Sequence, residues 1–417
     1  MGGSPVTRAF EISLAAGLAA AMVAAPVQAG TFTVRTEAGV EWDVAAPNSL
    51  DAALGFGERQ TGTATARLMW QEASGALRFE AHLLIGAAKG DNVAYRTAIA
   101  PFLPPSPPAT LFTLTTGSTN GDTLTAAAID RLSVSWSSEN LVLKAGRQAI
   151  TWGEGMVFHP ADIVAPFAPN ATDTSYKPGV DMLYGQYLFA SGADIQAIWV
   201  PRAQIAGGAV DPDASTIALR GALQAGAMDV SLMGARDRGD WVASTGLAGP
   251  LGEGTWKAEY VGWQVTGGAW RPSWLLSYAN VATLGDTSVS WFGEYFHNGF
   301  GTTPGTTLDA LPADLVKRLG TGQVFVTGRE YLALGASAQV NESLTLTPLA
   351  LMSLEDGSAL VSIGADWVLS DATNLTLNWS VPLGEPGTSF GGLETTAGSG
   401  VYASPASAAS LKLVHFF

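Results

Sequence analysis

The sequence predicts an all-β fold, a transmembrane antiparallel β-barrel of about 18 strands, with 16 strands as the fallback. Three observations predict it. The chain opens with a segment typical of export, residues 30–417 contain no uninterrupted apolar run long enough for a membrane helix, and several segments alternate between apolar and polar residues. Only helices and closed barrels satisfy every backbone polar group in lipid. A chain with 47% hydrophobic and only 14% charged residues is therefore expected to form a barrel.

Residues 1–29 are expected to be a secretory signal peptide. Arg8 precedes an apolar run over residues 12–25 that is rich in Ala and Leu, and small residues lead up to Ala29. The alternative is an N-terminal membrane anchor. We disfavour the anchor because the run is shorter than the ~20 residues that a spanning helix needs and because Pro26 ends it.

The strands are predicted from period-two alternation, which is clearest over residues 77–85, 131–137, 361–370 and 372–381. In the last of these, Leu375, Leu377 and Trp379 share one face, while the residues between them are polar. A soluble β-sandwich has the same alternation. It does not usually combine an export segment, an absence of cysteine and many tryptophans near strand ends, so the barrel is favoured.

Two lengths of connection are expected between the strands. Short turn signals such as Ser74-Gly75 and Ser370-Asp371 alternate with long irregular stretches at 86–124, 153–179, 203–214, 299–322 and 384–406. Outer-membrane barrels have short periplasmic turns and long extracellular loops. At about 10 residues a strand, 18 strands leave a similar number of residues for connections, so residues 30–417 are expected to form one barrel domain wide enough for a channel.

The C-terminus gives a separate indication. Leu411, Leu413, His415 and Phe417 fall on one parity, and the chain ends in an aromatic residue. This resembles the last strand of bacterial outer-membrane proteins, and the resemblance implies recognition of Phe417 by the barrel-insertion machinery. The expected location is the bacterial cell outer membrane, in contact with lipid and lipopolysaccharide.

If the apolar parity faces lipid, the polar parity faces the lumen. We expect most of these charges to be solvated spacers, since a barrel interior is polar anyway. The alternative is that Arg67, Arg78 and Arg131 oppose Glu80, Glu259 and Glu294 across a constriction, which would create a transverse field there. The predicted pore-lining residues are Arg67, Arg78, Glu80, His82, Arg131, Lys257, Glu259 and Glu294.

The loop around residues 153–179 is expected to fold inward and narrow the pore. Its prolines exclude regular structure, and residues such as Met156, Phe158 and Phe167 are unusually apolar for an exposed loop. We expect Arg147 to pair with Glu154 or Asp162 and to latch the loop, in preference to contacting solute. The predicted loop and constriction residues are Arg147, Gln148, Trp152, Glu154, His159 and Asp162.

Residues 146–148 (GRQ), 152–154 (WGE) and 160–162 (PAD) together resemble the DUF1302-type porin-like outer-membrane barrels and, more loosely, the alginate-export barrels. The resemblance covers residues 146–162. It implies a barrel of porin size with a structured loop at this place, and it does not indicate a substrate. The positions that carry it are Arg147, Gln148, Trp152, Glu154 and Asp162.

The loop at residues 299–322 is expected to contain a short helix. Asp309 is a candidate cap, Pro312 suits a first turn, and Gly320 suits the position after the helix. Leucines spaced by four give the helix one apolar face. The sequence leaves open whether this helix is a lid in the barrel mouth or lies on the outer surface.

The composition narrows the function. With 36 acidic and 21 basic residues the formal charge is −15, which disfavours nucleic acid as a partner. The chain has no cysteine, only four histidines and no G-x-S-x-G motif, so an enzyme is disfavoured. No cofactor is expected, and Glu154, His159 and Asp162 fit a metal site only loosely. The expected function is a porin-like channel for passive or selective passage of small solutes. The alternative is an export or surface-assembly barrel with periplasmic partners, and a homo-oligomer stays open.

Overall fold

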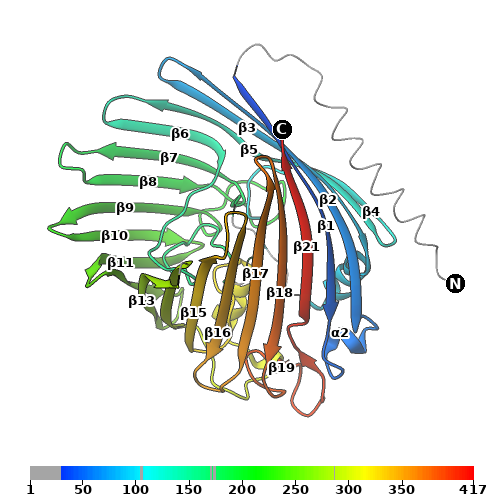
Figure 1. The fold of residues 1–417 in the computed structure, drawn as a ribbon. Helices are drawn as coiled ribbons and strands as arrows, with labels where there is room; N and C mark the ends of the chain where they lie inside the picture. Colours follow the sequence, from blue (N-terminus) through cyan, green and yellow to red (C-terminus); the bar gives the residue numbers. More distant parts are fainter. Residues whose placement is uncertain (1–29, 104–106, 170, 172–174, 286) are drawn as a thin grey trace.

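The computed structural model describes residues 30–103, 107–169, 171, 175–285 and 287–417 (Figure 1). The predicted signal peptide, residues 1–29, lies outside the described residues. The rest confirms the predicted fold, a closed antiparallel barrel of 18 strands. The barrel strands are β1 (Thr31–Val44), β2 (Glu58–Ser74), β3 (Leu77–Gly90), β5 (Thr123–Ser137), β6 (Leu141–Gln148), β7 (Val180–Leu188), β8 (Asp194–Val200), β9 (Thr216–Ala225), β10 (Met228–Asp237), β11 (Asp240–Leu251), β12 (Gly254–Gln264), β13 (Trp270–Leu284), β14 (Thr287–His297), β15 (Glu330–Gln339), β16 (Leu344–Ser353), β17 (Ala359–Ser370), β18 (Thr373–Leu383) and β21 (Ser407–Phe416).

The ring is closed by β1, which pairs with β2 on one side and with β21 on the other. Arg35, for example, lies opposite Arg67 in β2 and opposite Phe416 in β21. Every neighbouring pair is antiparallel, so no barrel strand leaves an open edge along its whole length. A further strand, β4 (Thr115–Asn120), pairs with the part of β5 that extends beyond β6.

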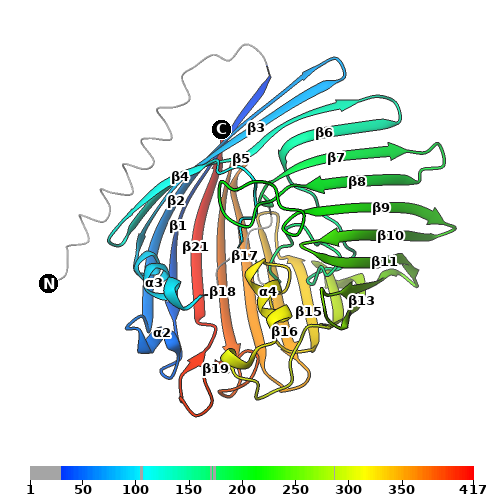
Figure 2. The same ribbon diagram turned by 180° about the vertical axis from the view of Figure 1, so that it is seen from behind.

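The connections differ between the two ends of the barrel. At one end, here called the turn end, short turns join the strands and the C-terminus lies beside them (Figure 1). The loop end carries the long connections that contain all the described helices: α2 (Leu50–Ala53), α3 (Asp91–Ile99), η1 (Ala100–Phe102), η2 (Leu308–Ala310) and α4 (Ala313–Gly320). Figure 2 shows α3 and α4 in front of the strands. None of these helices is long and apolar enough to cross a membrane.

One connection at the loop end is unexpectedly tight. β10 and β11 are joined by Arg238 and Gly239 alone, with φ angles of 48° and 87°. Positive φ at both central residues is the geometry that fits the twist of a two-residue hairpin. Arg238 is the only non-glycine among the described residues with positive φ.

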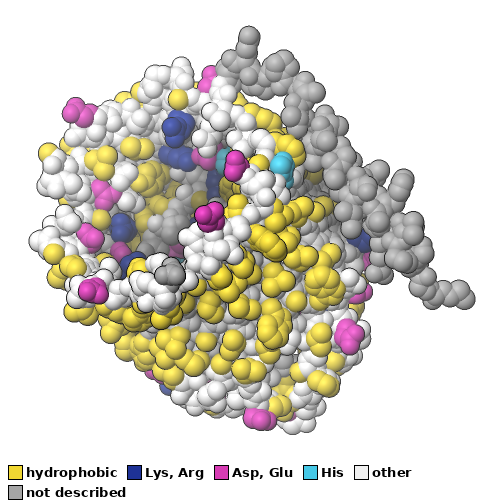
Figure 3. Space-filling model, in the orientation of Figure 1, with side chains coloured by type: hydrophobic (Ala, Val, Ile, Leu, Met, Phe, Trp, Pro, Cys, Tyr) yellow, Lys and Arg dark blue, Asp and Glu magenta, His cyan; other side chains and the backbone are white. Residues whose placement is uncertain are grey.

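The outward face of the barrel is apolar. Leucine, valine and tryptophan side chains on the outward parity are 37–67% exposed, as in Leu219, Leu232 and Trp379. Exposed tryptophans lie toward the loop end (Trp42, Trp199, Trp241 and Trp270) and toward the turn end (Trp136, Trp291 and Trp367). Figure 3 shows hydrophobic side chains covering the outer face of the strands in the foreground. Two aromatic girdles around an apolar band are typical of a barrel in a membrane.

The inward face is divided between polar and apolar residues. In β8, Asp194 and Gln196 lie near the turn end, whereas Ile198 and Val200 on the same parity are buried near the loop end. The apolar inward residues of β7 to β12 form one cluster with two inward loops, and those of β13 to β17 form a second. The expectation that the whole inward parity is polar is therefore wrong at the loop end, because loop residues pack there in place of water.

Candidate functional site: the loop that crosses the barrel

The connection from β6 to β7 crosses the interior of the barrel, and we call its described residues (149–169, 171 and 175–179) the strap. The strap reaches β14, which lies eight strands further round the ring than β6. There the carboxylate of Glu294 accepts backbone N–H groups from Met156 (2.6 Å), Val157 (3.1 Å) and Phe158 (2.8 Å). Glu294 is fully buried, so these charge-assisted bonds replace the water that its carboxylate loses.

A second glutamate, Glu259 in β12, anchors the strap in the same way. Its carboxylate oxygens accept the N–H of Glu154 at 2.6 Å and that of Ala161 at 2.8 Å. The residues between these two points, 154 to 161, therefore form a bend that wraps around two buried carboxylates. Phe158 at its tip stacks on Phe296 with ring centroids 4.4 Å apart.

A buried ion pair closes the strap on itself. Lys177 contacts Asp162 and donates to Ile150 O at 2.6 Å, so the outgoing and returning halves of the strap are joined. Burial raises the pKa of Asp162 although Lys177 opposes this rise. His159 lies nearby, and burial, together with Lys177 and Lys257, lowers its pKa to about 4. His159 is therefore neutral at pH 7.

The returning half of the strap covers a basic wall. The guanidinium of Arg67 lies 4.4 Å from the ring centre of Tyr176, and that of Arg35 lies 5.3 Å from it. Asp130, an extra residue in β5 where the register with β3 shifts, pairs with both Arg67 and Arg131. Arg131 also donates to Lys177 O. The basic wall (Arg35, Arg67 and Arg131) and the two glutamate anchors thus lie on different sides of the strap.

Arg147 does not pair with Glu154 or Asp162, and that expectation is wrong. Its guanidinium forms a bidentate pair with Asp181 in β7, at 2.9 and 3.0 Å. It also donates to Ile129 O and Phe112 O. These atoms lie near the point along β5 where pairing with β6 ends and pairing with β4 begins. Arg147 therefore seals a gap in the barrel wall. It pairs with Asp181 rather than with Glu154 or Asp162 because Asp181 lies directly opposite it in the β6–β7 ladder.

The remaining predicted loop residues hold the strap by separate contacts. Trp152 donates its indole N–H to Gln196 at 2.8 Å and packs in the first apolar cluster. Gln148 donates to Met182 O at 3.1 Å. The side chain of Glu154 lies 3.7 Å from Arg220. Glu154, His159 and Asp162 do not converge, and the described residues contain no group of three or more His, Cys, Asp or Glu that could hold a metal.

The other predicted pore-lining residues lie on the inward parity of β3 and β12. Glu80 pairs with Lys144 at 2.9 Å and lies 3.5 Å from the ring of His82. Arg78 is exposed near the turn end, away from the basic wall. Lys257 is half-buried two residues before Glu259. Figure 3 shows charged side chains gathered in the hollow at the turn end of the barrel.

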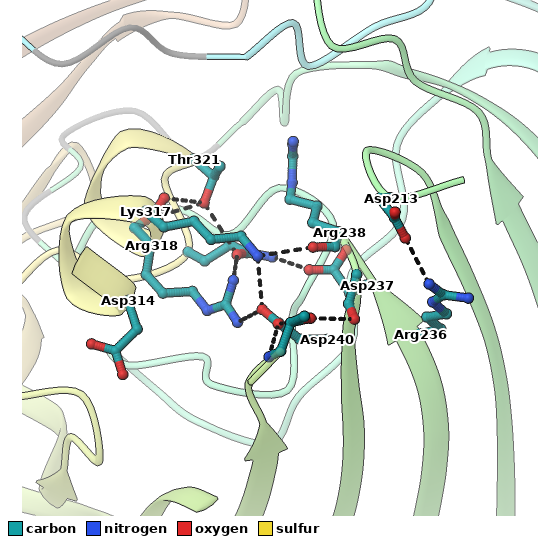
Figure 4. A network of polar contacts seen from close by, with 12 residues as sticks. Asp213, Arg236, Asp237, Arg238, Asp240, Asp314, Lys317, Arg318 and Thr321 are labelled. Atoms are coloured by element: carbon teal, nitrogen blue, oxygen red, sulfur yellow. Dashed lines mark hydrogen bonds and ion pairs between the residues drawn. The ribbon is translucent and has the colours of Figure 1, made fainter. Parts of the chain in front are cut away.

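The connection from β14 to β15 also folds inward. Leu315 in α4 is fully buried in the first cluster, and Gln323 donates to Ile163 O of the strap at 2.8 Å. Lys317 and Arg318 both contact Asp240 in β11 (Figure 4). The helix is therefore docked in the barrel mouth. Asp309 does not cap it, since α4 begins at Ala313 after Pro312.

Sequence reasoning missed several residues that build this site, namely Arg35, Asp130, Tyr176, Lys177 and Asp181. Tyr176 and Lys177 lie in a segment read only as an irregular loop. Asp130 becomes visible only through the register shift in β5. For Asp181 the sequence offered one indication, a charged residue between Val180 and Met182 at the start of a strand. All three residues are buried in the structure, so the expected alternation of exposed and buried positions fails there.

Comparisons with known proteins give the fold alone. No family model matches the sequence, and no curated protein matches it. Among solved structures, the Acinetobacter baumannii protein OccAB2 has a TM-score of 0.53 at 9% identity, over 93% of this chain and 98% of that one. A. baumannii OccAB1 has a TM-score of 0.52 at 8% identity, over 93% and 96%. Wzi, an Escherichia coli outer-membrane protein described as a carbohydrate-binding barrel involved in capsule assembly, has a TM-score of 0.51 at 9% identity, over 92% and 84%. The chain therefore has the porin-like barrel fold of these proteins.

Proposed function

We propose that this protein is an outer-membrane channel for small solutes, with the strap as its constriction. The observation that carries the proposal is the uneven filling of the barrel. On β7 to β17 the inward residues near the loop end are buried against the strap and the helical loop. On β1, β2, β18 and β21 the inward residues Glu41, Thr63, Asn378 and Ser410 are polar and remain exposed or half-buried. This accessible polar sector is our candidate for the solute path.

The sector has the character of a water-filled passage. Its inward side chains are small hydroxyl, amide or charged groups, which hydrate well and leave room for a solute. Glu37 and Lys412 form an ion pair at 3.4 Å within it, with side-chain exposures of 15% and 27%. A path in which acidic and basic groups lie beside neutral polar residues suits small hydrophilic solutes.

A matched pair of variants tests the path. Ser410 faces inward and Leu411 faces outward on the same strand, so Ser410→Trp should lower the single-channel conductance in planar bilayers and Leu411→Trp should not. Liposome swelling with sugars of increasing size should give a size limit that only Ser410→Trp reduces. Absence of conductance in the unmodified protein, or an equal effect of both variants, would overturn the proposal.

The second candidate is an export or surface-assembly barrel. The two apolar clusters favour it, since they close a large part of the mouth. Such a barrel would stay silent in bilayers when purified alone and would copurify with a periplasmic partner. The same bilayer recordings therefore separate the two candidates.

A further inference from the structure

Three buried arginines lie in one region of the loop end, and each comes from a different connection. Arg202 lies after β8, Arg238 in the tight turn between β10 and β11, and Arg318 in α4. They are 0%, 7% and 0% exposed. We call them the arginine triad. Gln323 links two of them, since it accepts from Arg318 at 3.4 Å and donates at 2.8 Å to Asp237, which lies 4.0 Å from Arg202. Arg238 follows Asp237 directly in the chain.

The carboxylates in contact with the triad are too few to neutralise it. Asp237 lies 4.0 Å from Arg202 and is also bonded by Thr216 and Gln323. Asp240 is shared between Arg318 and Lys317. Four cations therefore face two carboxylates, which leaves two formal positive charges. The nearby pairs Arg236–Asp213 and Arg271–Asp314 are each balanced on their own.

Each arginine of the triad also has an unused donor. The buried atoms Arg202 Nη2, Arg238 Nε and Arg318 Nε have no hydrogen-bond partner among the residues that the structure describes. Buried donors in native proteins are nearly always paired, and an unpaired one indicates a missing water or ion. Burial, together with the charge of Arg238, lowers the pKa of Arg202 to about 10, as expected for a cation without full compensation.

The backbone of Arg238 is an unusual place for an arginine. At φ 48° this turn position favours asparagine, aspartate or glycine. In Figure 4 the side chain of Arg238 extends away from Asp237 and Asp240 and makes no contact with the residues drawn. A residue that suits neither the turn nor a local ion pair indicates a role for its guanidinium.

We infer that the arginine triad binds an oxyanion of the phosphate class. A phosphate dianion matches the two excess charges, and its oxygens accept several N–H bonds from guanidinium groups. A carboxylate would supply only one charge. Lys317, which shares Asp240 with Arg318 and whose side chain is 39% exposed, adds a further positive charge beside the triad. The site goes beyond the proposed function, since it lies on the walls of the mouth and binds whether or not the barrel conducts.

The test is calorimetric titration of inorganic phosphate into the detergent-solubilised protein at low salt. Saturable binding is expected, weakened about tenfold or more by Arg238→Gln, since a hydrogen bond to a charged group is lost. Arg238 is the right position because its side chain forms no hydrogen bond or ion pair with the part of the chain that the structure describes, so the substitution breaks no such contact. Arg236→Gln, two residues away on the outward face, is the matched control and should bind as the unmodified protein does.

Formate and chloride titrations test the ligand class, and both should bind more weakly than phosphate. The source is distinguished by repeating the phosphate titration on protein refolded without lipopolysaccharide. Binding in both preparations indicates free phosphate or a phosphorylated solute, and binding only in the refolded protein indicates that lipid A phosphate fills the site. No phosphate binding in either preparation, no preference over chloride, or equal loss in Arg236→Gln would overturn the inference.

Discussion

Replacing Glu294 with glutamine tests whether one buried carboxylate holds the strap across the barrel. The carboxylate accepts three N–H groups, two at Oε1 and one at Oε2. Glutamine keeps one acceptor oxygen, loses the negative charge, and turns an NH2 group toward the third donor. Hydrogen bonds to charged groups contribute roughly 1.5–3 kcal/mol each, and the easier burial of a neutral amide offsets part of the loss. We expect strap docking to weaken by about 2 kcal/mol, or roughly thirtyfold in its equilibrium.

The assay uses the absence of cysteine in this chain. A single cysteine in place of Met156, whose side chain is 41% exposed, carries a spin label and keeps the backbone N–H that Glu294 binds. Glu294→Gln should increase the mobility of the label and raise the open-channel current. The control is Glu330→Gln, because Glu330 bonds Tyr295 and His297 on the outward face and does not touch the strap. Unchanged mobility and current in Glu294→Gln would refute the anchoring role.

Three further predictions concern the same loop. The pKa of His159 falls to about 4 in the folded protein, so its contribution to strap docking is complete above pH 6.5 and is lost as the pH falls toward 4. The loss amounts to about 3 kcal/mol. The mobility of the spin label at position 156 should rise over that interval and should stay constant in His159→Asn. Arg147→Met leaves Asp181 buried without its cationic partner, with only the Phe112 N–H still bonded to it, so the free energy of unfolding should fall by about 3–5 kcal/mol in denaturant titrations. Arg147→Met with Asp181→Leu should recover part of this loss, and equal stability of the single and double variants would contradict the prediction. Tyr176→Ala uncovers Arg35 and Arg67 toward the lumen, so the reversal potential in a salt gradient should shift in the direction of higher anion selectivity. An unchanged reversal potential would show that Tyr176 does not shield the basic wall.

The barrel could be predicted from sequence because its cause is local. Side chains alternate every two residues in a strand, so the pattern in residues 372–381 carries both the strand and its lipid-facing side. The inward course of the strap could also be predicted, since Val157, Phe158 and Ile163 are too apolar for a solvated loop and are all buried in the structure. Both inferences need only composition and period.

The pairing inside the barrel could not be predicted in the same way. Arg147 pairs with Asp181 because the register of β6 and β7 places them opposite one another. The register of two strands cannot be read from the sequence of the loop that joins them. Glu259 and Glu294 were expected to be solvated spacers or, in the alternative, to oppose arginines, yet they accept backbone N–H groups of a loop about 100 or more residues earlier in the chain. A carboxylate that binds a bent backbone leaves no mark on the side chains of its partner, so the sequence contains no complementary charge to detect.

The way in which buried charges are compensated separates the anchored part of the mouth from the part that is ready for a ligand. Glu259 and Glu294 are satisfied by N–H groups, and Arg147 is satisfied by Asp181, so each of these contacts is complete within the chain. A strap held by complete contacts has no reason to bind an ion in order to stay in place. The arginine triad is different, since its surplus charge and its unused donors persist after Asp237 and Asp240 are counted. If the mouth recognises anything with high affinity, charge balance therefore favours an anion at the triad, while the polar sector at β1, β2, β18 and β21 remains a passage with weak contacts.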